Sequence, residues 1–367
     1  MTAMPHESAD SPDIGIPDID PPESAIPVFG ERDLDLVNAL QINPRAPWGR
    51  IGVSLGMDAT TAARRWRRLT ESGLAWLTAY APEFATVAYI RLHCRTEAIA
   101  EISGRVCAWP WVVSVERITG HYALQLTVAL ENPGALDGFV TGALAALPGV
   151  LAVRPAIGLH TYLEGSHWRP QALDPAQRTL LTDAPDRSRP ASTRRPGDLE
   201  LLLALGPDAR RTNTDLAADT GLTESTVRRR ITEMTRSQRL LFRCDFAEAH
   251  AGWSVIMTYR ASLPAHDLDT VTAALRGWPE IRLCVATADD ESNLLLITWL
   301  RTPAESLHTE TRLHRSFPHL RITERQLTLR TLKRMGRLLN PAGLATTHVP
   351  FGLWTATGGF RPGAANS

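Results

Sequence analysis

The chain has 367 residues, a length that predicts two to four domains rather than one. Basic and acidic residues number 39 each, which excludes a uniformly basic protein that coats nucleic acid but allows a local basic face. The four cysteines lack the spacing of a zinc site, and no apolar run is long enough to span a bilayer. We therefore expect a cytoplasmic globular protein with no metal, no cofactor and no membrane contact.

In chain order, residues 1–28 come first, and they combine six acidic residues and several prolines with no lysine or arginine. Such a segment buries too little apolar surface to fold, so residues 1–28 are predicted to be a disordered N-terminus. Residues 166–197 hold five prolines among arginine, serine and aspartate, and they predict a linker. The tail at residues 341–367 has no assignable pattern.

The chain repeats itself between these stretches. The sequence DLDL at 33–36 reappears as DLEL at 198–201, and the Trp-Pro pair at 109–110 reappears at 278–279. Two homologous units in tandem are therefore predicted, and each pattern found in one unit is to be sought in the other.

Each unit opens with three predicted short helices. In the second unit they cover 198–205, 214–220 and 223–237, with Gly221 at a left-handed turn that favours glycine. Thr223 is the predicted N-cap of the third helix, as Asp58 is in the first unit. Apolar residues recur at helical spacing on the buried face of each third helix: Ala62, Trp66 and Leu69 in the first unit, and Val227, Ile231 and Met234 in the second.

The outward face of each third helix carries short hydroxyl residues followed by arginines. Such a helix suits the major groove of DNA, because its first turn reaches bases and phosphates and arginine forms a bidentate fork with guanine. A solvated arginine face is the alternative, and two copies behind a helix-turn-helix pattern favour DNA. The candidate DNA-binding residues are Thr60, Thr61, Arg64, Arg65, Arg68, Ser225, Thr226, Arg228, Arg229 and Arg230.

The rest of each unit alternates strand, helix, strand, strand, helix and strand. This is the ferredoxin-like order, an antiparallel sheet with two helices on one face. A second copy in the same chain is the obvious cover for the open face, so an intramolecular pseudo-dimer is predicted. The expected elements are 85–93, 97–108, 111–117, 122–130, 134–147 and 151–162 in the first unit, and 254–261, 267–277, 281–287, 293–301, 303–316 and 320–329 in the second.

The second unit contains the sequence NTDLAADTGLTESTVRRRI at 213–231, which resembles the helix-turn-helix of the Lrp/AsnC (leucine-responsive/asparagine-operon regulator) family. The strand–helix segments resemble that family's effector-binding and oligomerisation domain. The resemblance implies an α+β fold of two tandem units, each a winged helix-turn-helix followed by a ferredoxin-like βαββαβ domain. The implied boundaries are 29–80 and 81–165 in the first unit, 166–197 for the linker, 198–247 and 248–340 in the second unit, and 341–367 for the tail.

The resemblance also implies a function. Family members are transcriptional regulators that bind double-stranded DNA in a sequence-specific manner, respond to an amino acid or related small molecule, and assemble as homo-oligomers. Their effector turn joins the second and third strands of the sheet domain, although these turns are equally compatible with plain hairpin loops. The matching residues are Thr119, Gly120, His121 and Tyr122 in the first unit, and Thr287, Asp289, Asp290 and Asn293 in the second, longer and more acidic turn.

Two other functions stay open. Sirohaem decarboxylases resemble tandem Lrp/AsnC units and grip tetrapyrrole carboxylates with Tyr, His and Arg, for which Arg117, His121 and Tyr122 are candidates, but the acids of the second turn would repel carboxylates. A pure oligomerisation or co-regulator role is the other. No catalytic residue is predicted, because the G-x-S-x-G match at 52–56 lies inside an expected helix rather than on a strand-to-helix turn.

Overall fold

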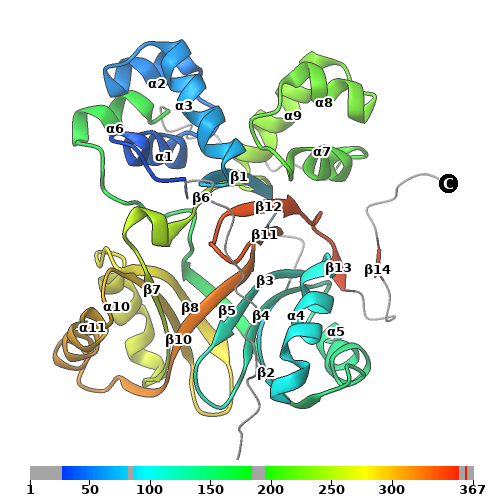
Figure 1. The fold of residues 1–367 in the computed structure, drawn as a ribbon, viewed down its shortest axis with the longest axis vertical. Helices are drawn as coiled ribbons and strands as arrows, with labels where there is room; N and C mark the ends of the chain where they lie inside the picture. The colour runs from blue at the N-terminus through cyan, green and yellow to red at the C-terminus, as the bar shows by residue number, and fades with distance from the viewer. Residues whose placement is uncertain (1–26, 82–85, 184–194, 355–359, 362–367) are drawn as a thin grey trace, which may run out of the picture.

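The computed structural model describes residues 27–81, 86–183, 195–354 and 360–361. Two helical heads lie at one end of the molecule, and the sheet with its flanking helices fills the other end (Figure 1). Within the described ranges, no helix is both long and apolar enough to cross a membrane. The expected disordered N-terminus lies outside the described residues, apart from its last two positions.

Each head consists of three helices followed by one strand. The second helix ends at a left-handed glycine in both heads, Gly56 with φ of 63° and Gly221 with φ of 69°. The second helix of the first head forms in spite of its two internal glycines, because Ile51 and Leu55 are buried in the head core. The bounds are α1 Asp33–Ile42, α2 Trp48–Leu55, α3 Ala59–Glu71 and β1 Ala75–Tyr80, and then α7 Asp198–Leu205, α8 Asn213–Thr220, α9 Glu224–Arg236 and β6 Leu241–Phe246.

The heads are joined through their strands. Strand β1 pairs antiparallel with β6 from Ala75 opposite Phe246 to Tyr80 opposite Leu241, so the wing strand of each head completes that of the other. Buried residues of both heads also belong to one continuous apolar core, which contains Leu40 and Leu205. The two heads are therefore packed as a unit rather than tethered separately.

The sheet domains follow the expected order of strands and helices. In the first unit the second helix is replaced by a short α-helix and a π-helical segment, in a stretch with glycines at 134, 138 and 142 that weaken helix formation. The bounds are β2 Thr86–Cys94, α4 Ile99–Ala108, β3 Val112–Ile118, β4 Leu124–Leu130, α5 Ala135–Gly138, η3 Phe139–Leu144 and β5 Val150–Leu163, and then β7 Val255–Ser262, α10 Leu268–Leu275, β8 Ile281–Ala288, β9 Leu294–Leu300, α11 Pro303–Ser316 and β10 Arg321–Arg334.

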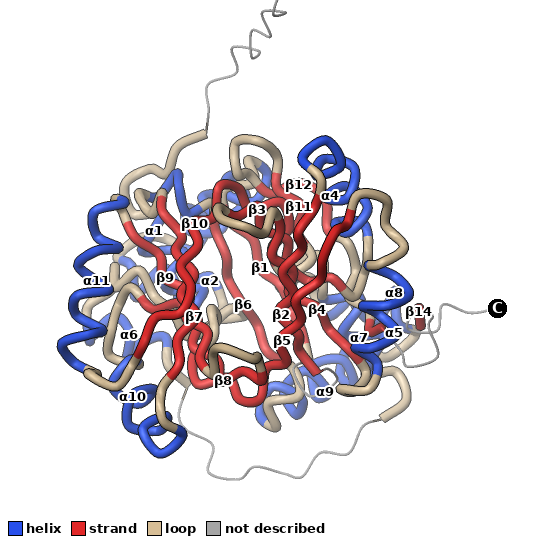
Figure 2. The backbone as a smooth tube through the Cα atoms, turned by 90° about the horizontal axis from the view of Figure 1, so that it is seen from below, coloured by secondary structure: helices blue, strands red, loops and turns tan. Residues whose placement is uncertain are grey.

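The two sheets join at both edges. Strand β5 pairs with β8, and β10 pairs with β3, so eight strands close a ring in the order β3-β4-β2-β5-β8-β9-β7-β10. The flanking helices lie outside this ring (Figure 2). Each unit therefore covers the open sheet face of the other, and the main hydrogen-bonding edges of both sheets are satisfied within one chain.

The stretch expected to be a linker is partly folded, which corrects that expectation for residues 166–183. It contains a helix, α6 Pro175–Leu181, which begins with a capping box between Asp174 and Gln177. Leu173 and Leu181 are buried against the first head. The burial of these apolar side chains stabilises a folded segment in spite of its prolines. Residues 184–194 lie outside the described residues.

The unassigned tail also contributes strands. They are β11 Arg337–Leu339, β12 Ala345–His348, β13 Leu353–Trp354 and β14 Phe360–Arg361. The Ala345 amide donates to the Gly73 carbonyl at 2.9 Å, and β13 pairs in parallel with β4. The end of the second unit therefore reaches back onto the first.

Candidate nucleic-acid interface and internal cavity

The third helix of each head is held by a side-chain cap and an apolar face. Asp58 accepts a hydrogen bond from the Thr61 amide at 2.9 Å, and Thr223 accepts one from the Thr226 amide at 3.3 Å. Both caps are those predicted. The inward residues are also those expected from the helical spacing: Ala62, Trp66 and Leu69 in α3, and Val227, Ile231 and Met234 in α9.

The hydroxyl residues in the first turns of α3 and α9 differ in their hydrogen bonds and in their exposure. The Thr61 hydroxyl donates to Asp58 at 2.6 Å, and the Thr223 hydroxyl lies within hydrogen-bond distance of Ser225 and Thr226, at 3.1 and 2.9 Å. Thr60 and Ser225 are exposed. These two occupy equivalent positions of the repeat.

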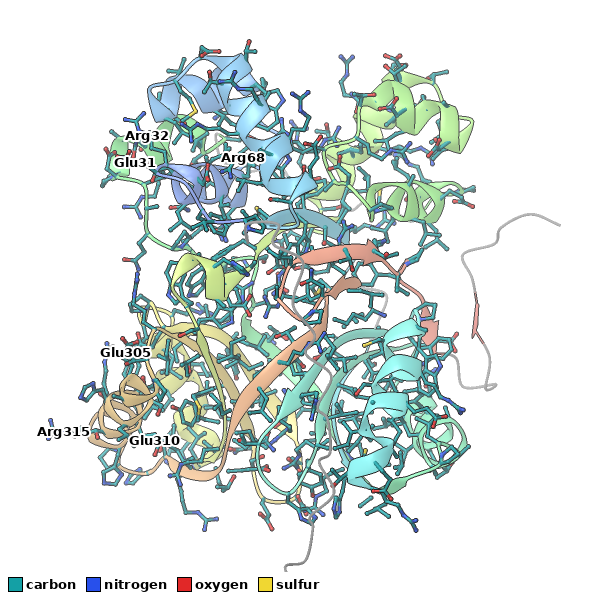
Figure 3. The ribbon with its side chains drawn as sticks, viewed as in Figure 1. Glu31, Arg32, Arg68, Glu305, Glu310 and Arg315 are labelled. Atoms are coloured by element: carbon teal, nitrogen blue, oxygen red, sulfur yellow. The ribbon has the colours of Figure 1, made fainter. Side chains whose placement is uncertain are left out.

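The arginines fall into two groups. Arg65 and Arg68 form ion pairs with the buried Asp33, and Arg230 forms one with the buried Asp198 at 3.4 Å. These three predicted DNA-binding residues therefore tie the third helix to the first helix of their own head. The other three, Arg64, Arg228 and Arg229, are exposed and form no ion pair within the described part of the chain. Figure 3 shows Arg68 beside the segment that begins α1.

The heads also contact each other through a reciprocal pair of arginines that the sequence analysis missed. Arg45 donates to the Ala209 carbonyl at 2.6 Å, and Arg210 donates to the Pro44 carbonyl at 2.6 Å. Arg210 lies 3.9 Å from the centre of the Trp48 ring. Burial lowers the pKa of Arg210 to about 10. The two arginines occupy equivalent positions of the repeat, and that repetition was the available signal.

The first predicted effector turn, between β3 and β4, packs against the other unit. The Thr119 amide donates to the Leu327 carbonyl at 2.9 Å, and the Leu327 amide donates back to the Thr119 hydroxyl at 2.9 Å. Gly120 has φ of 100°, which requires glycine. The His121 ring lies 4.1 Å from the His93 ring, and Tyr122 lies beneath Arg91 at 5.0 Å.

The second predicted turn is engaged in a buried charge cluster. Asp289 pairs with Arg91 at 3.1 Å and with Arg260 at 3.5 Å, and Glu324 also pairs with both arginines. Asp290 forms an ion pair with Arg154. Asn293 exchanges two hydrogen bonds with the Leu263 backbone at 3.1 and 2.8 Å, and Thr287 is buried. Asp289 and Asp290 therefore join the two units, whereas Asn293 bonds within its own unit and the Thr287 hydroxyl has no hydrogen-bond partner in the described part of the chain.

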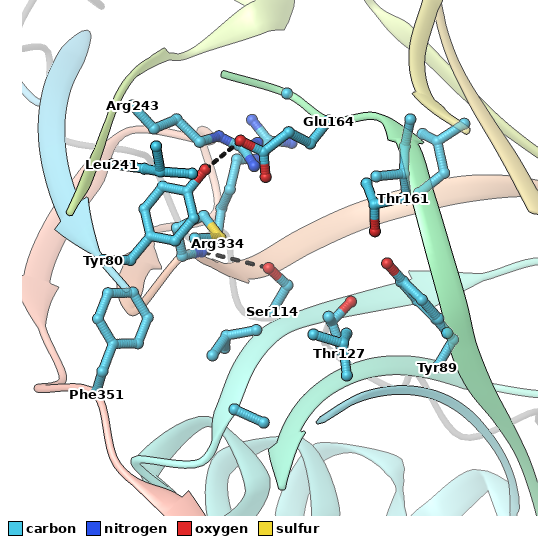
Figure 4. Close-up of a pocket in the computed structure, with 18 of the residues that line it drawn as sticks. Tyr80, Tyr89, Ser114, Thr127, Thr161, Glu164, Leu241, Arg243, Arg334 and Phe351 are labelled. Carbon is cyan, nitrogen blue, oxygen red and sulfur yellow. Dashed lines mark hydrogen bonds between the residues drawn. The ribbon is translucent and has the colours of Figure 1, made fainter. Parts of the chain in front are cut away.

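A large cavity lies elsewhere, between the strand ring and the paired strands β1 and β6. Its volume is about 1460 Å³, and its wall includes residues of both units (Figure 4). Glu116, Glu164, Arg243 and Arg334 are among the charged residues that line it. Sequence reasoning could not find this site, because its residues come from many separate segments and share no motif.

The family comparisons agree with the repeat. The model of the AsnC-type helix-turn-helix domain matches residues 31–70 and 197–235, and the model of the Lrp/AsnC ligand binding domain matches residues 87–168. The HTH-type transcriptional regulator FL11 of Pyrococcus horikoshii is 26% identical over 139 residues, which are 36% of this chain and 91% of that protein. The Bkd operon transcriptional regulator of Pseudomonas aeruginosa is 25% identical over 139 residues, with the same coverage.

A solved structure matches both units together. The siroheme decarboxylase NirDL is similar with a TM-score of 0.55 and 11% sequence identity, and the match covers 82% of this chain and 92% of that chain. At this identity the likeness concerns the fold alone. Fold and family models together define a tandem helix-turn-helix protein with α+β sheet domains. The chain carries two AsnC-type helix-turn-helix domains and an Lrp/AsnC ligand binding domain, in two tandem units of one polypeptide.

Proposed function

We propose that this protein is a sequence-specific transcriptional regulator that binds duplex DNA with its two heads. The observation that carries the proposal is the repeated third helix, capped at its N-terminus and with Arg64 and Arg229 exposed at equivalent positions. Curated relatives that match one unit over nearly their whole length are named transcriptional regulators, which supports it. The fold shared with a decarboxylase does not transfer its activity, and we propose no catalytic role.

The division of the arginines assigns separate roles within the DNA interface. Arg64, Arg228 and Arg229 supply contacts to phosphates and base edges, with Thr60 and Ser225 at the groove floor. Arg65, Arg68 and Arg230 act indirectly, because their ion pairs with Asp33 and Asp198 orient the third helices. A small-molecule effector and the association of whole chains into oligomers complete the proposal.

The contacts between the two heads predict a DNA site whose two half-sites are separated by a fixed distance. The β1–β6 pairing and the Arg45 and Arg210 contacts hold α3 and α9 in one mutual arrangement. Because the two helices carry different residues, the preferred site consists of two unequal half-sites. Changing the spacing between these half-sites by half a helical turn of DNA will lower the affinity.

The test is fluorescence anisotropy over a salt series, with the duplex upstream of the protein's own gene and a scrambled duplex. The variant Arg64→Ala/Arg229→Ala removes the two equivalent exposed arginines. The control Arg105→Ala/Arg315→Ala removes the same charge from α4 and α11, and Figure 3 shows Arg315 far from the heads. We expect the first variant to lower the affinity and the salt slope by about two units, and the control to bind as the native protein does. Equal binding by both variants would contradict the proposal.

A further inference from the structure

The roof of the internal cavity is made by the elements that carry the DNA-binding helices. Tyr80 at the end of β1, Leu241 and Arg243 in β6, and Leu199 and Leu202 in α7 all line it. Its floor and walls come from the strand ring, as Figure 4 shows for Tyr89 and Thr127. A molecule in the cavity therefore touches both the sheets and the heads.

Much of the lining is apolar or aromatic. The rings of Tyr89, Trp299 and Phe351 contribute to it, together with Ile256 and Ile297. Such a wall favours a ligand with an apolar body. The faces of Tyr89 and Phe351 can also attract a cation through their quadrupole, whereas the Trp299 ring already lies under Arg282 at 3.7 Å and Arg334 at 5.1 Å.

The arginines of the cavity wall are already bound by acids. Arg243 and Arg282 pair with the buried Asp245, the former at 2.7 Å. Arg334 forms two hydrogen bonds with Glu248, one of them at 2.8 Å. Asp245 and Glu248 are not part of the lining, so each arginine is bound from the side away from the cavity. Three guanidinium groups therefore share two carboxylates that lie outside the lining, and each guanidinium is held by one of them.

Glu116 is an acid of the cavity wall that lacks a bound partner among the described residues. The Glu116 side chain has no hydrogen bond or ion pair within the described part of the chain, and one of its carboxylate oxygens is buried. Burial raises the pKa of Glu116 to about 7, against the opposing influence of Arg334 and Arg243. Glu131 and Glu164 line the same cavity, and Glu164 accepts hydrogen bonds from the Tyr80 and Ser166 hydroxyls. The lining holds three glutamates and three arginines, and the three arginines are the ones that Asp245 and Glu248 bind from behind.

We propose that the cavity binds an organic cation, with an apolar or aromatic body among the rings and a positively charged nitrogen or phosphorus centre beside Glu116. This ligand is the effector of the regulator, and that role rests on the proposed function. Binding itself does not, because every residue that lines the site belongs to this chain and none is supplied by DNA. Polycarboxylates such as tetrapyrroles are disfavoured by the same acids.

The experiment is isothermal titration calorimetry of the full chain without DNA at pH 8. The probes are tetraphenylphosphonium and tetraphenylborate, which have nearly the same size and shape and opposite charge. The variants are Glu116→Gln and, as a control on the surface of α4, Glu101→Gln. We expect the native protein to bind the phosphonium at least about tenfold more tightly than the borate. We also expect Glu116→Gln to abolish most of that preference and Glu101→Gln to retain it.

Three results would overturn the proposal. One is a preference of the native protein for tetraphenylborate, which needs no variant to interpret. Another is an unchanged preference in a folded Glu116→Gln protein. The third is tight binding of uroporphyrin III, a polycarboxylate tetrapyrrole. None of these depends on DNA, so a failure of the ligand proposal is distinguishable from a failure of the anisotropy test.

Discussion

Asp33 and Asp198 begin the first helix of each head at equivalent positions, and both are buried. Their partners differ in exposure. Asp198 pairs with Arg230 and with Arg239, whose side chains are 15% and 5% exposed, whereas Asp33 pairs with Arg65 and Arg68, which are 37% and 46% exposed. Loss of the acid therefore breaks ion pairs that are shielded from water in the second head and ion pairs that are open to water in the first.

This difference predicts unequal effects of the same substitution. We expect Asp198→Asn to lower the free energy of unfolding by about 3 kcal/mol, because it breaks ion pairs with two arginines that are largely shielded from water. We expect Asp33→Asn to cost about 1 kcal/mol, since Arg65 and Arg68 can turn to water. Urea denaturation followed by circular dichroism measures both. Equal losses of unfolding free energy in the two variants would show that burial of the paired arginines does not determine the effect of the substitution.

Glu116 predicts a dependence of stability on pH. Burial raises its pKa from 4.5 to about 7, so between these values the folded protein holds a proton that the unfolded chain has released. The contribution of this proton to the stability of the fold is complete below pH 4.5 and is lost as the pH rises through 7. At pH 8 the native protein is destabilised by at most about 3 kcal/mol relative to a neutral side chain at this position.

The Glu116→Gln variant isolates this effect. We expect its denaturation midpoint to exceed that of the native protein at pH 8 and the two midpoints to converge at pH 5, where the native carboxyl is protonated. Thermal denaturation across this range measures the difference. Two curves that stay parallel from pH 5 to pH 8 would contradict the raised pKa.

At the scale of elements, the contact between the loops after α1 and α7 predicts how the heads cooperate. Replacing both Arg45 and Arg210 by alanine removes the reciprocal hydrogen bonds to Ala209 and Pro44. We expect weaker binding of a duplex with both half-sites and unchanged binding of a duplex with one, because each recognition helix stays intact. Anisotropy with the two duplexes measures this. An equal loss on both would mean that the arginines act within each head.

The elements themselves were largely predictable from local sequence. Helix Pro303–Ser316 was predicted to the residue, because Pro303 begins it and apolar spacing continues through it. Helix α6 was missed, although Asp174 and Gln177 have the spacing of a capping box, because prolines suggested a linker. The pairing of Arg65 with Asp33 was not predictable, since it depends on how α1 and α3 cross. The pairing of β10 with β3 is non-local, and no local pattern specifies it.

At the scale of the whole molecule, the closed ring predicts that neither unit is complete alone. Residues 195–367 retain β8 and β10 but lack β5 and β3, their partners from the first unit. Two open edges and an uncovered sheet face favour association. We expect this fragment to elute from a size-exclusion column as a dimer or larger species. A stable monomer would contradict the interpretation that the sheets depend on each other.

The cluster of Arg91, Arg260, Asp289 and Glu324 has two cations and two acids, and both acids belong to the second unit. Strand pairing places Arg154 in the first unit where Glu324 stands in the second. A homodimer contains every residue twice. Two copies of the first unit would place arginines together without these acids. Two copies of the second unit would place twice as many acids as arginines together. Joining the units in one gene releases them from that duplication. Each unit can then change its residues independently of the other. The charges of the cluster can balance although the two units contribute different numbers of acids and arginines.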